Sequence, residues 1–177
     1  MESLVRAVRC AEPVGGVRIV GIDGPSGSGK TTLAAGLCRA LGAGLVQIDD
    51  FVSWDDLHGW WPRFERQVLD PLLAGRDARY QVRDWEGDEF GRSLKGWKTT
   101  AHAPLIVVEG VTCTRARTVG RVACAVWVEA PAATRLRRGL QRDGESHRAL
   151  WQRWQAQEDA FFRADGTRDR ADLIIDT

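Results

Sequence analysis

The sequence carries little net charge and no long apolar run, and both absences narrow what the protein can do. Its 177 residues hold 25 Lys and Arg against 24 Asp and Glu, which gives a net charge of +1. Because domains that bind nucleic acid present a basic surface, we expect no nucleic-acid partner. No stretch approaches the roughly 18 apolar residues that a membrane span requires. Residues 1–11 also lack the apolar segment of a secretory signal, so we expect a cytoplasmic protein with no membrane partner.

Closely spaced cysteines are absent as well. The four cysteines lie at positions 10, 38, 113 and 124 and form no CxxC pair, so we expect free thiols rather than a zinc site or disulfides. No internal repeat or low-complexity linker divides the chain. The length is sufficient for one domain with a hydrophobic core. We therefore expect a single domain over residues 1–177, present as a monomer or homodimer.

Short apolar runs alternate with segments of helical periodicity. Buried strands are predicted at 17–22, 45–48, 105–108, 123–128 and 173–175. Helices are predicted at 31–41, 60–73, 131–142 and 147–163, and a polar, glycine-rich loop over the site at 84–100. Strands that read as continuous apolar runs favour a sheet covered on both faces. The sequence thus predicts an α/β three-layer sandwich, with a mostly parallel sheet of about five strands and helices on both faces.

A glycine-rich motif follows the first predicted strand and opens the first long helix. Residues 24–31 read GPSGSGKT and fit G-x-x-x-x-G-K-[ST] at every position. Glycines let backbone N–H groups turn inward around phosphates, and the N-terminus of the next helix adds a positive dipole. The lysine of such a loop reaches the β and γ phosphates, and its threonine binds Mg²⁺. We predict that ATP and Mg²⁺ bind here, through Gly24, Ser26, Gly27, Ser28, Gly29, Lys30, Thr31 and Thr32.

Carboxylates follow two of the predicted strands, at the edge where ligands of open α/β sheets bind. Glu109 directly follows the run LIVV, and we predict that it holds Mg²⁺ together with Thr31. Asp49 and Asp50 follow the second strand. We predict that Asp49 aligns the acceptor hydroxyl and takes its proton, and that Asp50 neighbours the substrate or the metal. Asp23, just before the glycine-rich loop, is a candidate for supporting this site.

Arginines are concentrated on the predicted helix after the strand at 123–128. Arg135, Arg138 and Arg142 fall at i, i+3 and i+7 and are expected to share one face. Guanidinium groups suit the charge that spreads over a transferring phosphoryl group. We predict that Arg138 and Arg142 act in catalysis on a short lid at about residues 135–146. A solvated basic helix face is the alternative.

Four segments together resemble a known family. GIDGPSGSGKTT, IDDF, VVEG and WVEAPAATRLRRGLQRD are similar to the uridine kinase-like branch of P-loop kinases, close to phosphoribulokinase and pantothenate kinase. The resemblance spans residues 17–177 and implies that Asp49 is the catalytic aspartate. The family's tyrosine in Asp-Ser-Phe-Tyr is replaced by Val52. Tyr80 matches the segment that holds the nucleoside, whereas Gln81 and Trp85 replace its Asp and His.

Aromatic and charged residues gather between positions 50 and 100, where this architecture places the acceptor. Tryptophans could stack a base or a sugar there, and Arg63 or Arg66 could hold an acceptor phosphate. The predicted substrate-binding residues are Asp50, Tyr80, Arg83 and Trp85. The other aromatic candidates in this region are Trp54, Trp60, Trp61 and Trp97, whereas Trp127, Trp151 and Trp154 are expected to pack in the core.

These features favour an ATP- and Mg²⁺-dependent kinase that transfers the γ-phosphoryl group to a hydroxyl of a nucleoside-like or other polar small molecule. One alternative is a nucleoside monophosphate kinase, with Arg63 or Arg66 on the acceptor phosphate. Another is an ATP-binding regulatory protein without turnover. The sequence has no N-K-x-D motif, which argues against a GTPase switch.

Overall fold

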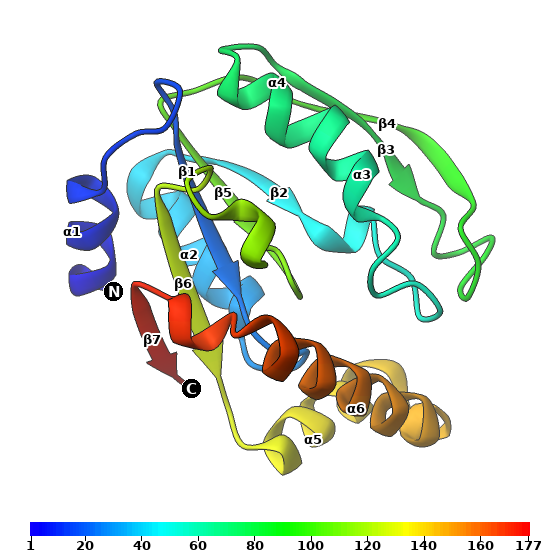
Figure 1. Ribbon diagram of the computed structural model, residues 1–177. Coiled ribbons are helices and arrows are strands. Elements are labelled where there is room, and N and C mark those ends of the chain that lie inside the picture. The colour runs from blue at the N-terminus through cyan, green and yellow to red at the C-terminus, as the bar shows by residue number, and fades with distance from the viewer.

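The computed structural model describes residues 1–177 and has a five-stranded sheet at its centre (Figure 1). All neighbouring strands in the sheet pair in parallel. In spatial order the strands are β2 (Gly44–Gln47), β5 (Leu105–Glu109), β1 (Arg18–Asp23), β6 (Cys124–Glu129) and β7 (Leu173–Asp176). The predicted fold class is confirmed, and both ends of each strand lie within one residue of the predicted ends.

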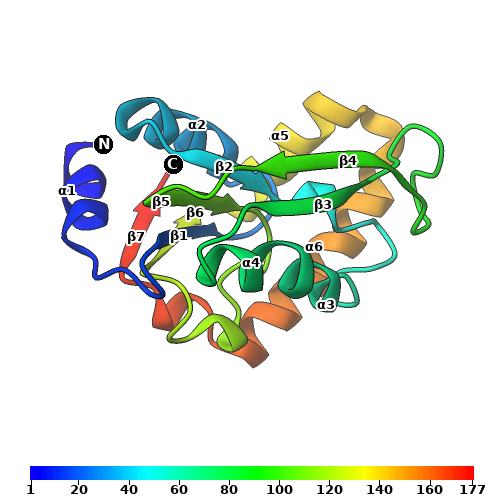
Figure 2. The same cartoon turned by 90° about the horizontal axis from the view of Figure 1, so that it is seen from above.

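Helices cover both faces of the sheet, as Figure 2 shows. One face carries α1 (Glu2–Cys10) and α2 (Lys30–Leu41). The other carries α6 (Arg148–Asp165) and a continuous helical segment made of α3 (Trp61–Phe64), the π-helical turn η2 (Glu65–Leu69) and α4 (Asp70–Leu73). α5 (Ala132–Asp143) packs against α6. No helix has the length and apolar character needed to cross a membrane.

Alternating strand residues build two separate hydrophobic cores. Ile19 of β1 packs with the aromatic side chains of the α3–α4 segment and α6, whereas Val20 packs with α1 and α2. Both side chains are completely buried. Successive side chains of a strand point to opposite faces, and a central strand of a covered sheet therefore needs apolar residues at every position. This requirement explains the continuous apolar runs in the sequence.

A two-stranded antiparallel hairpin lies beside the main sheet, made of β3 (Ala78–Arg83) and β4 (Leu94–Thr100). The prediction of a loop over 84–100 is therefore wrong for its second half. Nearly every β4 residue is exposed. A strand that buries no face needs no apolar pattern, so periodicity could not reveal it.

Candidate active site

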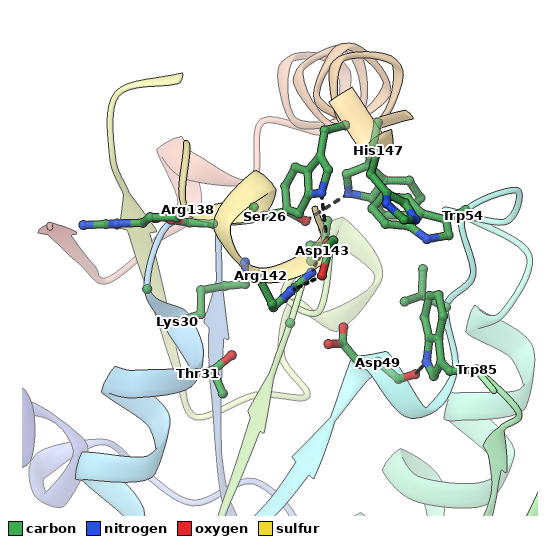
Figure 3. A pocket seen from close by; sticks show the side chains of 18 of the residues that line it. Ser26, Lys30, Thr31, Asp49, Trp54, Trp85, Arg138, Arg142, Asp143 and His147 are labelled. Atoms are coloured by element: carbon green, nitrogen blue, oxygen red, sulfur yellow. Dashed lines mark hydrogen bonds and ion pairs between the residues drawn. The ribbon is translucent and has the colours of Figure 1, made fainter. Parts of the chain in front are cut away.

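A cavity of about 680 Å³ opens at the carboxyl ends of the parallel strands (Figure 3). Three groups of residues line it: the glycine-rich loop with the start of α2, the ends of β2 and β5, and the α5–α6 region facing the β3–β4 hairpin. The lining residues are Ser26, Gly27, Gly29, Lys30, Thr31, Asp49, Val52, Trp54, Trp85, Glu89, Glu109, Gly110, Val111, Arg138, Gly139, Arg142, Asp143, His147, Trp151 and Trp154.

The glycine-rich loop connects β1 to α2, as the motif requires. Gly27 adopts φ 77°, and a Cβ there would lie 2.6 Å from the carbonyl oxygen of Arg135, so the close approach of loop and α5 needs glycine. The Lys30 side chain is 6% exposed, and its Nζ donates a hydrogen bond to the Pro25 carbonyl at 2.9 Å. This ammonium group has no carboxylate partner within ion-pair distance, so its charge is available to a phosphate.

Three predicted residues of the motif do not line the cavity. Gly24 and Ser28 are buried, and the Ser28 carbonyl accepts a hydrogen bond from Thr177 Oγ1 at 2.6 Å. Thr32 is exposed on the first turn of α2. Gly24 and Ser28 shape the loop, whereas the cavity-facing residues are Ser26, Gly27, Gly29, Lys30 and Thr31.

Thr31 and Glu109 lie together on the floor of the cavity. The Thr31 hydroxyl lies 3.3 Å from Glu109 Oε1, and Gln47 Nε2 donates to the same oxygen at 3.2 Å. Burial raises the pKa of Glu109, the nearby Asp49 raises it further, and Lys30 opposes both. No cluster of three or more metal-ligating side chains exists in the molecule. A hydroxyl and one carboxylate still fit Mg²⁺, which keeps most of its water ligands and binds substrate phosphates.

Asp49 follows β2 and lies in the short turn η1 (Ile48–Asp50). Its side chain faces the cavity. Solvent reaches this carboxylate through the open cavity. The surrounding protein nevertheless raises its pKa by limiting its hydration, while the positive charges of Lys30 and Arg142 oppose the rise. Trp85 forms the adjacent wall, and its indole Nε1 donates to the Asp49 carbonyl at 2.8 Å. Both residues therefore lie where a substrate could meet them.

Two predicted substrate residues lie away from the cavity. Asp50 points to the opposite side from Asp49 and forms an ion pair with Lys98 of β4 at 2.8 Å. Tyr80 is 2% exposed, and its ring stacks on Phe51 with centroids 5.2 Å apart. The expected contacts of Asp50 and Tyr80 with substrate are therefore corrected. Tyr80 is a core residue under the β3–β4 hairpin.

The arginines of the acceptor region serve the fold. The Arg83 guanidinium binds four backbone carbonyls of the loop between β3 and β4, those of Asp84, Asp88, Glu89 and Ser93. Arg63 donates to the carbonyls of Gln81, Asp50 and Phe51. Arg66 is exposed on the surface. None of the three lines the cavity, which corrects the predicted substrate contact of Arg83.

The three α5 arginines contact different parts of the protein. Arg135 is 5% exposed beneath the glycine-rich loop, and Arg138 extends away from the cavity centre to the Gly27 carbonyl and Thr177 Oγ1, each at 3.1 Å. Only Arg142 reaches toward Asp49, and it forms an ion pair with Asp143 at 2.7 Å. Arg138 nevertheless lines the cavity, and its catalytic role stays a prediction. The predicted lid consists of the end of α5 and a 3₁₀ turn, η4 (Glu145–His147).

Of the four tryptophans that line the cavity, Trp54 and Trp85 were predicted in the acceptor region, whereas Trp151 and Trp154 were not. Trp151 and Trp154 of α6 line the cavity rather than packing only in the core, and both stand nearly perpendicular to Trp54, with centroids 5.8 and 5.3 Å away. Gly139 permits this packing, because a Cβ would meet the Trp151 indole at 2.4 Å. The spacing Trp151, Trp154 and Glu158 on one helix face is the sequence signal that could have indicated a functional wall.

Other predicted aromatic residues lie elsewhere. Trp60 and Trp61 are buried, and the Arg115 guanidinium carbon lies 4.6 and 4.5 Å from their ring centroids, while Trp97 is 50% exposed on β4. Trp127 packs in the core as expected. Asp23 is completely buried and accepts hydrogen bonds from the backbone N–H groups of Gly24, Thr112 and Thr114 at 2.7 Å each. It therefore supports the site by joining the glycine-rich loop to the segment after β5.

The fold and this site define a P-loop nucleotide-binding domain. The family model described as an AAA domain matches residues 20–160, and the chain belongs to this family. Comparison with curated proteins finds no match.

Two solved structures share the fold over nearly the whole chain. A possible uridine kinase from Bacillus stearothermophilus has a TM-score of 0.72 and 21% identity, with 99% of this chain and 96% of that chain covered. A candidate fructose transport system kinase from Silicibacter sp. TM1040 has a TM-score of 0.73 and 20% identity, with 97% of each chain covered. The resemblance to uridine kinase-like P-loop kinases is thereby confirmed for the fold.

Proposed function

We propose that the chain is an ATP-dependent phosphotransferase that moves the γ-phosphoryl group to a hydroxyl of an uncharged, nucleoside-like or other polar small molecule. One observation carries this proposal. A single cavity brings the Asp49 carboxylate opposite Lys30 and Thr31, and Glu109 lines the same cavity 3.3 Å from the Thr31 hydroxyl. A phosphoryl transferase needs this combination of phosphate cradle, metal ligands and acceptor-aligning carboxylate.

Each residue has a defined task in this reaction. The loop amides and Lys30 bind the phosphates, and Thr31 and Glu109 hold Mg²⁺, which offsets negative charge on the β and γ phosphates when bound. Asp49 orients the acceptor hydroxyl and takes its proton as the new oxygen–phosphorus bond forms. The bond from the γ phosphorus to the bridging oxygen breaks, and ADP leaves with that oxygen. Arg142 lies near enough to influence Asp49 electrostatically and is suited to the charge of the transferring group.

The charges at the acceptor end favour an uncharged acceptor over a nucleoside monophosphate. Arg142 is paired with Asp143, and His147 lies 3.1 Å from Glu89. Arg63 and Arg83 are engaged by backbone carbonyls outside the cavity. A second phosphate would have to displace one of these partners, because Arg138, the other arginine that lines the cavity, points to the Gly27 carbonyl and Thr177. The tryptophan wall instead suits the flat face of a base or a sugar.

ADP release measured with Mg²⁺ and ATP across a panel of uncharged hydroxyl compounds and monophosphates tests the proposal. We expect release that depends on at least one uncharged compound and on Lys30. Tight ATP binding without acceptor-dependent release over a broad panel would favour a regulatory nucleotide-binding protein instead.

A further inference from the structure

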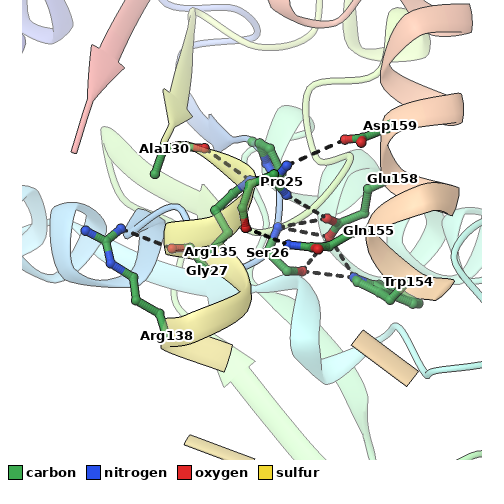
Figure 4. Close-up of polar contacts among 12 residues, drawn as sticks. Pro25, Ser26, Gly27, Ala130, Arg135, Arg138, Trp154, Gln155, Glu158 and Asp159 are labelled. Atoms are coloured by element: carbon green, nitrogen blue, oxygen red, sulfur yellow. Dashed lines mark hydrogen bonds and ion pairs between the residues drawn. The ribbon is translucent and has the colours of Figure 1, made fainter. Parts of the chain in front are cut away.

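A buried carboxylate that does not line the cavity contacts the glycine-rich loop of residues 24–29, called the P-loop below (Figure 4). Glu158 of α6 is completely buried. Its two oxygens accept the backbone N–H of Ser26 at 2.9 and 3.1 Å, and Oε1 also accepts the Ser26 hydroxyl. The indole Nε1 of Trp154 donates to the same Oε1 at 2.6 Å. Four hydrogen-bond contacts thus converge on one side chain.

A carboxylate is an unexpected group beside a loop that binds anions. Burial of an unpaired carboxylate is costly, and its negative charge opposes that of bound phosphates. Arg135 of α5 offsets part of this charge, with Nη1 3.6 Å from Glu158 Oε2 and the side chain 5% exposed. Two buried charged groups, Glu158 and Arg135, therefore take part in binding one residue of the P-loop.

The position of Ser26 explains why it needs holding. Ser26 lies between Gly24 and Gly27 in the loop, and it lines the cavity. The N–H of Ser28 is already bonded to the Pro25 carbonyl at 3.2 Å. The hydrogen bonds between Glu158 and Ser26 restrict the conformations that the rest of the loop can adopt. A loop ordered before binding loses less conformational entropy when the phosphates arrive.

We propose that Glu158 is a positioning residue of the P-loop, which orders the phosphate cradle by binding Ser26. The inference rests on the proposed function only in that a nucleotide's phosphates occupy this loop. Trp154 gives the arrangement a second role, because the same indole that donates to Glu158 and Ser26 stands against Trp54 in the acceptor wall. Glu158 thus fixes a side chain at each end of the cavity.

Two measurements on the full chain test this role. Hydrogen exchange of the peptide that covers residues 24–29, without nucleotide, reports the order of the loop. Calorimetric titration with ATP and with tripolyphosphate reports the phosphate cradle alone. In Glu158→Ala we expect faster exchange in this peptide and about tenfold weaker binding of both ligands, the scale of one lost hydrogen bond to a charged group. Glu158→Gln retains an acceptor for the Ser26 N–H and is expected to bind within about threefold of wild type.

Two controls separate positioning from general destabilisation. Asp159→Ala removes the neighbouring exposed carboxylate, which also contacts Arg135 at 3.7 Å but not the P-loop, and should change neither readout. Phe162→Ala weakens α6 packing against Trp127 without touching the loop. If Phe162→Ala, at an equal loss of melting temperature, weakens tripolyphosphate binding as much as Glu158→Ala does, the positioning role is overturned. Unchanged loop exchange in Glu158→Ala also overturns it, whatever the outcome of any turnover assay.

Discussion

The two ends of the cavity are built on different principles. At the phosphate end, contiguous residues 24–31 present backbone amides and one lysine, whose only polar partner is a carbonyl. At the acceptor end, separate segments supply tryptophans and polar groups, and most of those polar groups bind one another. Arg142 meets Asp143, and His147 meets Glu89. Asp49 is the acceptor-side carboxylate without such a pair.

This difference separates what is general from what is specific. Under the proposed function, a lysine without an ion pair and those loop amides that no protein group engages accept the phosphates of any nucleoside triphosphate. Paired charges and aromatic faces give the acceptor end few ways to bind a second anion, and they leave shape and stacking to choose the substrate. Under the proposed function, the phosphate end therefore binds the nucleotide and the acceptor end selects the substrate.

The largest effect is expected at the phosphate end. Lys30→Ala removes the cation that offsets charge on the β and γ phosphates, and we predict a loss of kcat on the order of 10³-fold. Steady-state ADP release checks this, with far-ultraviolet circular dichroism as a control for folding. Retention of full activity would refute the assigned role of Lys30.

A smaller loss is expected where the two ends meet. Asp49→Asn keeps the shape but cannot take a proton, and we predict a fall in kcat of about 10²-fold with the ATP dissociation constant unchanged. In the wild type, kcat should fall as the pH drops through the raised pKa of Asp49, because only the ionised carboxylate accepts a proton. A pH–rate profile shows this acid limb. An equal loss of ATP binding in the variant would instead assign Asp49 to the nucleotide.

The tryptophan wall tests the acceptor end alone. Trp54 stands against Trp85, Trp151 and Trp154, with ring centroids 5.3 to 6.5 Å apart. Trp54→Ala removes one stacking face worth about 1–3 kcal/mol, which corresponds to a rise in acceptor KM of about 5- to 150-fold. Initial rates at varied acceptor and varied ATP separate the two constants. A rise confined to the KM for ATP would break the division between the two ends.

The smallest effect is expected for Arg66, which the sequence suggested as a ligand of an acceptor phosphate. Arg66 is exposed and lines no cavity, so Arg66→Ala should change unfolding free energy by less than about 0.5 kcal/mol and leave kcat and both KM values unaltered. Chemical denaturation and steady-state kinetics measure these quantities. Loss of activity with a monophosphate acceptor in this variant would show that the acceptor end does use a free cation.

The same contrast explains what the sequence could predict. The P-loop is a local structure, and its spacing specifies glycine turns, a lysine and a threonine on the first turn of a helix. The buried parallel strands are equally readable, because each must be apolar on both faces. Glu109 and Asp49 followed from their places at strand ends, and the structure brings both to the cavity.

Side-chain direction was not readable in the same way. Asp49 and Asp50 are adjacent, yet one faces the cavity and the other meets Lys98 on a hairpin strand that has no apolar pattern. Tyr80 matched a family motif but is buried under that hairpin. Trp154 and Glu158 lie more than 100 residues from Ser26 in the chain, so only the packing of α6 against the P-loop reveals their contact.

The central claim is that the γ-phosphoryl group passes to an uncharged hydroxyl compound. The most direct measurement uses ATP labelled in its γ-phosphoryl group and matched pairs of acceptors, each pair consisting of a hydroxyl compound and its monophosphate. Product analysis should find the label in the uncharged member of at least one pair and in no monophosphate, with no transfer in Lys30→Ala. Label transferred only to monophosphates, or to no acceptor while ATP binds, would contradict the proposed function.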